Sequence, residues 1–404
     1  MWIPRGRLYH TISQSIKYLL WSLIYKLELK QSDKQKLESM FADYIGVKHC
    51  KVFPSARIAL LFSLRALNLP SGTKILMPPI TIKPMLDVVY SLNLEPVFVD
   101  LNKENFASDP DDLVRKIDSS TKVLFLTYLF GSVPDMTRIN KIVEENSLIL
   151  IEDFSQAIGA SFQSRKVGSF GTISIYSSSS IKTFDSLGGG FAVTNDFNLN
   201  SNLLDSQLQL LKPKRTILIK KAFSNLVRNI STNTVVFSLL TANFLKVLRR
   251  TSQVSANRMT GTRSQSPLGS LPRDWFRGYT QVQCKIALEQ FLEINQKLEL
   301  RIMNAKNVLE QDKSGDYELS KHDVYWQLCV LSEDISKVFS SAIENYIDIC
   351  QTSLSLISEN KFYPHHLYCS NAIEIYNQSF FVPCYPQLTS SQLDRLRIWL
   401  RSIE

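Results

Sequence analysis

The sequence predicts an α/β protein with a mostly parallel sheet covered by helices, followed by a smaller C-terminal α+β domain. Short apolar segments such as "LILIEDF" alternate with amphipathic segments from residue 35 to about 200, a pattern typical of β-α-β units. The 404 residues, 44% hydrophobic and 21% charged, suit a globular protein with more than one subdomain. Right-handed crossovers would then place the carboxyl ends of the strands along one ligand-binding edge.

The elements of this α/β unit follow one another regularly. We expect strands over 50–53, 74–79, 95–100, 122–130 and 148–154, and a β-rich run over 171–177. We expect helices over 36–46, 55–67, 85–94, 110–117 and 135–147. Gly46 is a plausible C-cap and Ser55 a good N-cap.

The chain is expected to divide into four parts. An N-terminal amphipathic helical segment covers residues 1–34, and a large α/β domain covers 35–200. A basic apolar helical insert with a loop covers 201–270, and a linking helix with a small C-terminal domain covers 271–404. Within them we expect a loop over 251–270 and one long amphipathic helix over 281–311. The last helix is expected to be capped by Thr389 or Ser390.

Two segments allow a second interpretation. Residues 13–27 place Ile16, Leu20, Leu23 and Leu27 on one helical stripe, so this helix either packs on the body, which we favour, or lies on a membrane. Residues 204–250 combine apolar helices with many Lys and Arg residues. They form either a subunit-packing or lid-like helix pair, or an attachment to an anionic bilayer.

Composition narrows the class of partner. The net charge of +9 suits acidic small molecules, phosphates or an anionic surface. No nucleic-acid-binding pattern is present. The six cysteines are scattered without a C-x-x-C pair, and the five histidines show no metal spacing. We therefore expect free thiols in a reducing cytoplasm, with neither a metal site nor an export signal.

Polar side chains fall at the ends of the predicted strands. Asp100, Tyr128 and Asp153 lie at or just after strand ends. Glu152 and Asp153 are adjacent, so strand alternation points them in opposite directions. One of them can face the ligand edge while the other turns towards solvent or a helix end. A buried carboxylate there needs a cation partner.

A single lysine stands between a serine run and three glycines in "SIYSSSSIKTFDSLGGGF", residues 174–191. Lys182 is a candidate Schiff-base former because burial and neighbouring cations can lower the pKa of a lysine. The serines Ser177–Ser180 could bind a phosphate, and Gly188–Gly190 would let backbone lie close to a flat ligand. The alternative is a low-complexity surface turn.

The combined pattern resembles the DegT/DnrJ/EryC1/StrS sugar aminotransferases, which are pyridoxal-phosphate (PLP) enzymes of the aspartate-aminotransferase fold, fold type I. The resemblance is carried by "PVFVDLNKENF", "DPDDLVRKI", "TKVLFLTYLFGSVPDM" and "ILIEDFSQAIGASFQSRKVGSFGTISIYSSSSIKTFDSLGGGFAVTND". It extends over residues 35–200 and returns more faintly over 280–305 and 379–396.

The resemblance implies a role for individual residues. Lys182 corresponds to the lysine that holds PLP, and Asp153 to the acid that pairs with the ring nitrogen and keeps it protonated. Gln156 corresponds to the glutamine near the ring face or its hydroxyl, and Ser177 to a phosphate-binding serine. Ser55, Ala56 and Arg57 correspond to the phosphate-binding turn at a helix N-terminus.

Three positions depart from the family pattern. Arg57 replaces a threonine, and its guanidinium could bind phosphate instead. Ile82 stands where an aromatic residue stacks on the cofactor ring in many members. Phe276, in "WFRGYT", stands where the family has an asparagine that reaches the phosphate of the neighbouring subunit.

The resemblance implies an aminotransferase that passes an amino group from a donor, typically glutamate, to a nucleotide-linked keto-sugar for surface polysaccharide or amino-sugar biosynthesis. Lys182 would shuttle the proton as general base and acid. One family branch replaces this lysine with histidine and dehydrates its substrate, so Lys182 favours amino transfer. A cytoplasmic homodimer is expected. The alternatives are a related dehydratase or lyase, and a non-catalytic, membrane-associated member of the family.

Overall fold

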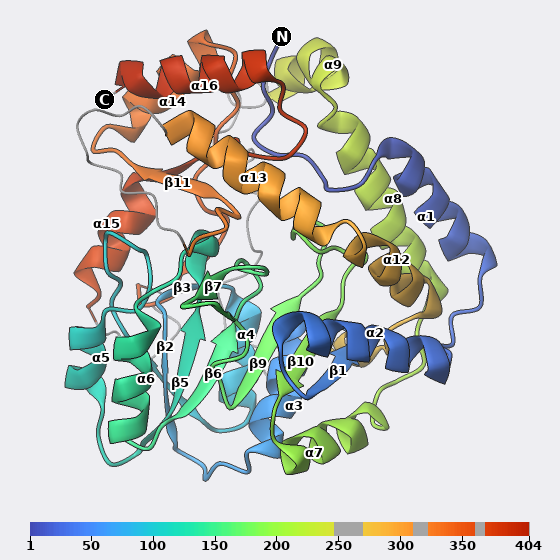
Figure 1. The fold of residues 1–404 in the computed structure, drawn as a ribbon, viewed down its shortest axis with the longest axis vertical. Coiled ribbons are helices and arrows are strands. Elements are labelled where there is room, and N and C mark those ends of the chain that lie inside the picture. Colours follow the sequence, from blue (N-terminus) through green and yellow to red (C-terminus); the bar gives the residue numbers. More distant parts are fainter. Residues whose placement is uncertain (246–269, 310–321, 360–367, 404) are drawn as a thin grey trace.

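The computed structural model describes residues 1–245, 270–309, 322–359 and 368–403. Its centre is a seven-stranded sheet with the order β1-β10-β9-β6-β5-β2-β4 (Figure 1). The strands are β1 (His49–Phe53), β2 (Lys74–Met77), β4 (Glu95–Phe98), β5 (Thr121–Thr127), β6 (Ile149–Asp153), β9 (Ile173–Ser177) and β10 (Gly190–Thr194). Only β10 runs antiparallel to its neighbours, so the expected mostly parallel sheet is confirmed.

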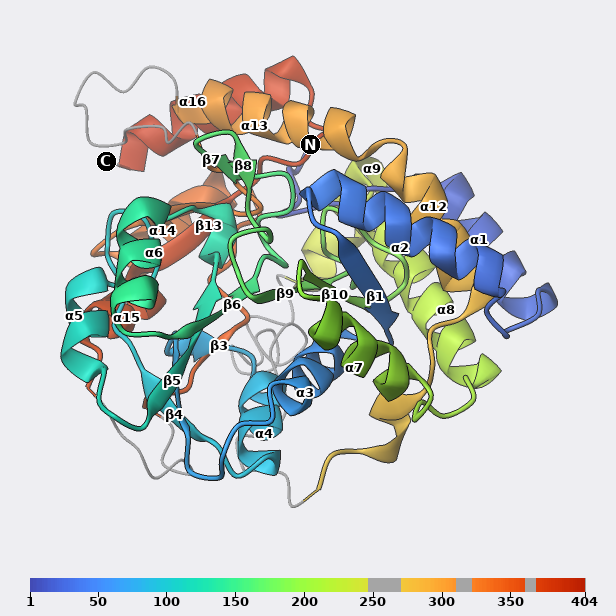
Figure 2. The same cartoon turned by 60° about the horizontal axis from the view of Figure 1, so that its bottom comes forward.

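Helices cover both faces of this sheet (Figures 1 and 2). They are α2 (Gln31–Ile45), α3 (Ala56–Ala66), α4 (Lys83–Ser91), α5 (Pro110–Lys116), α6 (Met136–Glu145) and α7 (Phe197–Gln207). Alternate strand residues enter two separate cores: Leu124 and Leu126 pack with α2 and α6, whereas Val123 and Phe125 pack with α3 and α4. The strand period of two therefore divides the core into two layers.

The predicted boundaries hold for some of these elements and fail for others. Gly46 ends α2 in the left-handed conformation, with φ 85°, as expected of a C-cap glycine. The predicted strand over 122–130 is wrong at its end, because β5 stops at Thr127 and a 3₁₀ turn η1 (Leu129–Gly131) follows. Phe130 has φ 59°, and its N–H donates to Gln156 Oε1 at 2.9 Å, which turns the chain out of the sheet.

A third core lies beyond the carboxyl edge of the sheet and is drawn above it in Figure 1. Its elements are α13 (Ile294–Leu309), β11 (Leu328–Leu331), α14 (Ile335–Glu344), β13 (Ser379–Val382) and α16 (Ser390–Ile403). The helix α15 (Ser370–Gln378) instead buries Ala372 and Ile375 in the core that contains α3 and α4. β11 and β13 pair antiparallel. Thr389 Oγ1 accepts a hydrogen bond from Gln392 N at 3.3 Å, so Thr389 caps α16, one of the two caps expected.

Two short strand pairs and one turn lie between these layers. They are β3 (Ile80–Thr81) with β12 (Ser355–Leu356), β7 (Ser161–Phe162) with β8 (Arg165–Lys166), and the 3₁₀ turn η3 (Arg273–Phe276). The β3–β12 pair joins the large sheet to the C-terminal part of the chain.

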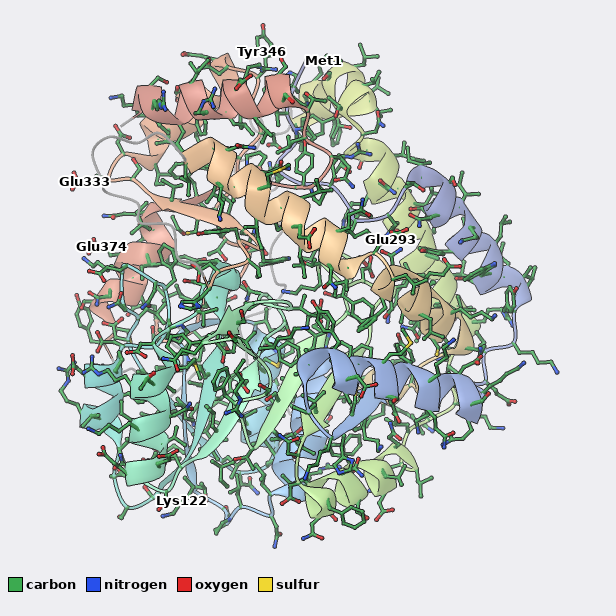
Figure 3. The ribbon with its side chains drawn as sticks, in the orientation of Figure 1. Met1, Lys122, Glu293, Glu333, Tyr346 and Glu374 are labelled. Atoms are coloured by element: carbon green, nitrogen blue, oxygen red, sulfur yellow. The ribbon has the colours of Figure 1, made fainter. Side chains whose placement is uncertain are left out.

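The single long helix predicted over 281–311 is wrong. The chain forms α12 (Gln281–Phe291) and α13, separated at Leu292 and Glu293. Each of these two residues donates its N–H to a carbonyl three residues earlier, a tighter turn than an α-helix. The break lets α12 pack on α2 while α13 packs on α16; Glu293 lies at the junction (Figure 3).

The N-terminal helix α1 (Ile12–Ile24) packs on α8 (Arg215–Ser231), from the predicted insert, and both lie at the outer side of α12 (Figure 1). This agrees with a packed helix, but the buried residues of α1 are Ser15, Tyr18 and Ser22. Of the predicted stripe, Ile16, Leu20 and Leu23 stay 46–52% exposed, because Asn225 and Asn229 of α8 bind the opposite face. Its fourth member, Leu27, is partly buried.

The insert continues from α8 into the short helix α9 (Thr234–Val236) and a π-helical turn η2 (Phe237–Thr241). Phe237 and Ala242 pack on Trp2. Of the loop predicted over 251–270, all but Ser270 lies outside the described residues. The four domain boundaries stay a prediction.

Candidate active site

Lys182 lies in the loop 178–189 between β9 and β10, at the carboxyl end of β9. The loop is closed by hydrogen bonds from Ser178 N to Gly189 O at 3.1 Å and from Gly188 N to Ser178 O at 3.0 Å. Lys182 is only 9% exposed. Its Nζ lies 3.8 Å from the ring centroid of Trp326, whose Nε1 donates to the carbonyl of Ile181 at 3.1 Å. The alternative of a surface turn is therefore wrong.

Burial changes the acidity of this lysine. It lowers the pKa of Lys182 to about 8, and the charge of Asp153 acts in the opposite direction. A lysine of this kind is a substantially better nucleophile near neutral pH than an exposed one, because more of it carries a free electron pair.

Asp153 is the last residue of β6 and is 8% exposed. Its Oδ1 accepts the N–H of Ser155 at 3.0 Å, and the hydroxyl of Ser155 accepts the N–H of Ser177 at 2.9 Å. Burial raises the pKa of Asp153, whereas the bonds from Ser155 and the charge of Lys182 lower it. The parallel strands β6 and β9 thus bring Asp153, Ser177 and Lys182 to one edge of the sheet.

The adjacent Glu152 points away from this edge, as strand alternation requires, but the expectation that the second acid reaches solvent or a helix end is wrong. Glu152 is fully buried. It accepts hydrogen bonds from Tyr128 Oη at 2.6 Å, Gly168 N at 2.7 Å and Ser174 Oγ at 2.9 Å, and also from Gly171 N. These donors replace the cation that such a carboxylate would otherwise need.

Gln156 follows β6 and is 7% exposed. Its Oε1 already accepts the N–H of Phe130 at 2.9 Å, so this side chain fixes the turn that ends β5. Ile82 precedes α4 as its N-cap residue and packs beside the core formed by α3 and α4. Their contacts with a cofactor ring stay a prediction.

The predicted phosphate-binding turn lies at the N-terminus of α3. Ser55 occupies the N-cap position in an extended conformation, but its side chain makes no capping bond. Its Oγ is buried and has no hydrogen-bond partner among the residues that the structure describes. A buried hydroxyl without a partner is costly, and a ligand oxygen at the helix N-terminus would satisfy it.

Arg57 lies over the ring of Trp275, with 4.4 Å between its Cζ and the ring centroid. Burial lowers the pKa of Arg57, and Asp87 opposes that shift. Phe276, where the family pattern has asparagine, packs edge-on against Phe62 with 6.4 Å between centroids. Its side chain is therefore part of the core of its own chain.

The three consecutive glycines pack against the site. A Cβ on Gly190 would lie 2.4 Å from Ala56 N and 2.2 Å from Ser55 C, and one on Gly189, at φ 149°, would lie 2.6 Å from Ser178 Oγ. A Cβ on Gly188 would lie 2.8 Å from Lys221 Nζ. Backbone therefore passes close to the predicted phosphate-binding turn, and no larger residue fits at Gly190. The predicted approach of these glycines to a flat ligand stays a prediction.

Sequence reasoning missed the residues that hold the lysine loop from outside. Asp185, 1% exposed, accepts from Asn225 Nδ2 at 3.2 Å, and its Oδ2 lies 3.8 Å from His10 Nδ1. Asp185 lies within the segment that carries the family resemblance but was given no role. His10, Asn225, Trp275 and Trp326 lie outside it, and no spacing rule indicates them.

The residues suit PLP chemically. A buried lysine with a lowered pKa faces a buried carboxylate, and an unsatisfied hydroxyl with an arginine lies at a helix N-terminus; these are the donor and acceptor types that an aldehyde, a pyridine nitrogen and a phosphate require. No group of three or more His, Cys, Asp or Glu side chains suited to a metal occurs in the described part of the chain.

Comparison with known proteins gives consistent relatives. A model of the DegT/DnrJ/EryC1/StrS aminotransferase family matches residues 14–259. The chain is 30% identical over 185 residues to the L-glutamine:2-deoxy-scyllo-inosose aminotransferase of Streptomyces kanamyceticus, covering 46% of this chain and 43% of that protein. It is 28% identical over 192 residues to the GDP-perosamine synthase of Vibrio cholerae, covering 48% and 51% respectively. The matched segment thus spans about half the length of these relatives.

Solved structures share the fold over nearly the whole chain. Helicobacter pylori PseC, an aminotransferase involved in the biosynthesis of pseudoaminic acid, superposes with a TM-score of 0.74 at 18% identity, covering 100% of this chain and 99% of that chain. A GDP-4-keto-6-deoxymannose-3-dehydratase with a trapped PLP-glutamate geminal diamine gives a TM-score of 0.71 at 18% identity, covering 98% of both chains. The predicted fold class, PLP fold type I, is confirmed.

Proposed function

The chain belongs to the DegT/DnrJ/EryC1/StrS aminotransferase family, and from that membership we propose that it is a PLP-dependent aminotransferase. It transfers an amino group, with glutamate as donor, to the carbonyl of a nucleotide-linked keto-sugar. The observation that carries this proposal is Lys182, buried at the carboxyl edge of the sheet with a pKa lowered to about 8 and electrostatically coupled to Asp153.

Each residue would contribute one task. When bound, PLP withdraws electrons from the substrate carbon beside the amino group, so that a proton can leave it. Lys182 would hold the cofactor and then move that proton as base and acid. Asp153 would hold the proton on the ring nitrogen. Gln156 and Ile82 would position the ring.

The phosphate would be bound by Ser55 Oγ, the N–H groups of Ala56 and Arg57, the Arg57 guanidinium and Ser177. The N-terminal partial charge of α3 adds to these donors. The buried hydroxyl of Ser55, which has no partner among the described residues, supports this assignment.

The substrate class is supported by the names of relatives. GDP-perosamine synthase names a GDP-linked sugar, and the Streptomyces relative names a cyclitol ketone and glutamine. The net charge of +9 suits a nucleotide diphosphate, and we therefore propose the nucleotide sugar. Products of such a reaction suit surface polysaccharide or amino-sugar biosynthesis.

The visible absorption spectrum of the protein with added PLP tests the proposal. We expect a band that is absent in Lys182→Ala and that bleaches when glutamate is added. Glutamine, added separately, distinguishes the second donor. The absence of any band in the wild-type protein would contradict the proposed function and leave a non-catalytic protein with this fold.

The same assay separates amino transfer from dehydration. An aminotransferase converts glutamate to 2-oxoglutarate and retains nitrogen in the sugar product, whereas a dehydratase or lyase releases water or another group and returns no aminated sugar. Mass measurement of the product from GDP-, UDP- and TDP-linked 4-keto-sugars, with the cyclitol ketone as a further arm, identifies both the reaction and the substrate.

We propose a cytoplasmic homodimer, with peripheral contact to an anionic membrane as a second candidate property. No described helix is long and apolar enough to cross a bilayer. The exposed apolar residues on α1, α8 and the segment after α9, such as Leu20, Phe223 and Leu239, favour a contact surface of one of these kinds. Sedimentation measures the dimer, and co-pelleting with phosphatidylglycerol vesicles measures the membrane contact.

A further inference from the structure

The insert helix α8 reaches the site as well as the surface. We propose that Lys221 of α8 is a ligand of the cofactor phosphate and that, with Arg57, it replaces the asparagine contact expected at position 276. This inference rests on the proposed function, since it assumes that PLP occupies the site. It assigns a binding role to a segment that the family pattern treats as an insertion.

The phase of α8 directs Lys221 inward. Asn225, one helical turn further on, is 1% exposed and donates to Asp185 Oδ2 at 3.2 Å, and residues four apart share a helix face. Lys221 therefore extends towards the same loop. The Lys221 Nζ packs against Gly188, because a Cβ atom on this glycine would lie only 2.8 Å from it. The absence of a side chain at Gly188 leaves room for the ammonium.

Lys221 packs against the glycine run that passes the predicted phosphate-binding turn. Gly188 is two residues before Gly190. The backbone of Gly190 passes so close to the Ser55–Ala56 peptide that a Cβ on Gly190 would overlap this peptide. Burial lowers the pKa of Lys221, the positive charge of Arg57 lowers it further, and Asp185 opposes the shift. Lys221 thus lies within electrostatic reach of Arg57 in the first turn of α3, where the Ser55 hydroxyl has no hydrogen-bond partner among the described residues.

Neither cation is neutralised by a bonded carboxylate. Within the described residues, the side chains of Lys221 and Arg57 form no ion pair or hydrogen bond; Asp87 is bonded instead to Lys83 at 2.7 Å, and Asp185 to Asn225. Two like charges placed close together destabilise each other. Asp87 and Asp185 offset part of this repulsion by their charge, without a direct bond to either cation, and a phosphate dianion bound by both cations would offset the rest.

The experiment compares PLP with pyridoxal, which has the same ring and aldehyde but no phosphate. Both are titrated into apo protein for the wild type, Lys221→Gln and Lys220→Gln. We expect the Kd for PLP to rise about 10- to 100-fold in Lys221→Gln, the range for a lost charge-assisted hydrogen bond. The Kd for pyridoxal should change less than about threefold. Lys220, the exposed neighbour on the same helix, should leave both values unchanged.

Each outcome decides one point. If Lys221→Gln binds PLP as tightly as the wild type, or loses PLP and pyridoxal equally, the phosphate role is wrong and the lysine is structural. Lys221→Arg should recover part of the PLP affinity and guards against a folding defect. If the wild-type protein binds neither compound, the proposed function has failed before this inference is tested.

Discussion

The two ends of the candidate site are built in different ways. At the ring end, Asp153, Gln156 and Lys182 come from adjacent strands and the loops that follow them. At the phosphate end, Arg57 and Lys221 come from helices that are distant in sequence, and Trp275 comes from a third segment. The ring end therefore depends on sheet topology, which sequence periodicity indicates. The phosphate end combines the Ser55–Arg57 turn, which the family resemblance indicated, with Lys221 and Trp275, which tertiary packing brings in and no local pattern encodes.

The largest effect is expected at the ring end, from Asp153→Asn. An amide cannot hold the proton on the ring nitrogen as a carboxylate does, so turnover should fall on the order of 10³-fold, about 4 kcal/mol in activation free energy. The Kd for PLP should change less than about fivefold, because the phosphate contacts remain. Single-turnover kinetics with glutamate measure the first effect and PLP titration the second. An unchanged rate would remove Asp153 from the mechanism.

The neighbouring acid should affect stability instead. In Glu152→Gln, whichever way the amide is turned, its NH₂ group faces one of the backbone donors Gly168 and Gly171, which now bind separate oxygens of the carboxylate. One buried N–H then loses its acceptor, at a cost of about 2–3 kcal/mol in free energy of unfolding. Urea unfolding of the apo protein measures this, with Asp153→Asn as the matched control. Equal stability of the two variants would contradict the assigned division of roles.

The contrast between the ring end and the phosphate end also determines how much of the site could be predicted from the sequence. Lys182, Asp153 and Ser177 lie together because parallel strands end at one edge, and that much could be inferred from apolar runs and one resemblance. Glu152 was placed on the correct side of its strand, but its burial was missed, because the Gly168 and Gly171 donors belong to a turn whose path no periodicity reveals.

The fold was predictable to a similar depth. The parallel strands of the sheet were predictable from hydrophobic periodicity, whereas the antiparallel strand β10 was not among the predicted strands. The exposed stripe on α1 could not be foreseen, because Ser15 and Tyr18 are buried through bonds to Asn229 and Gln290, more than 200 residues away. Polar pairing of this kind overrides an apolar stripe, and only the assembled structure reveals it.

A smaller effect is expected at the phosphate end from Trp275→Leu. The tryptophan ring lies against the Arg57 guanidinium, and a contact of this kind contributes about 0.5–2 kcal/mol. Releasing the guanidinium should weaken PLP binding about tenfold while pyridoxal binding stays nearly constant. Trp21→Leu, on the outer helix α1, is the control for general loss of packing. Equal weakening of both compounds would indicate that Trp275 acts on the fold and not on the phosphate.

The smallest effect separates the two ends by pH. The Lys182 pKa of about 8 means that the neutral amine rises from about 10% at pH 7 to about 50% at pH 8. The rate at which pyridoxal adds to Lys182 should therefore increase about fivefold over that interval and level off above about pH 9. A lysine with an ordinary pKa near 10.4 would instead gain about tenfold per pH unit past pH 9.

Asp153 raises the Lys182 pKa, so Asp153→Asn should move the profile to lower pH. Lys221→Gln, at the phosphate end, should leave the midpoint in place. A midpoint that moved in both variants would mean that the two ends form one electrostatic unit, and the contrast drawn between them would have to be abandoned.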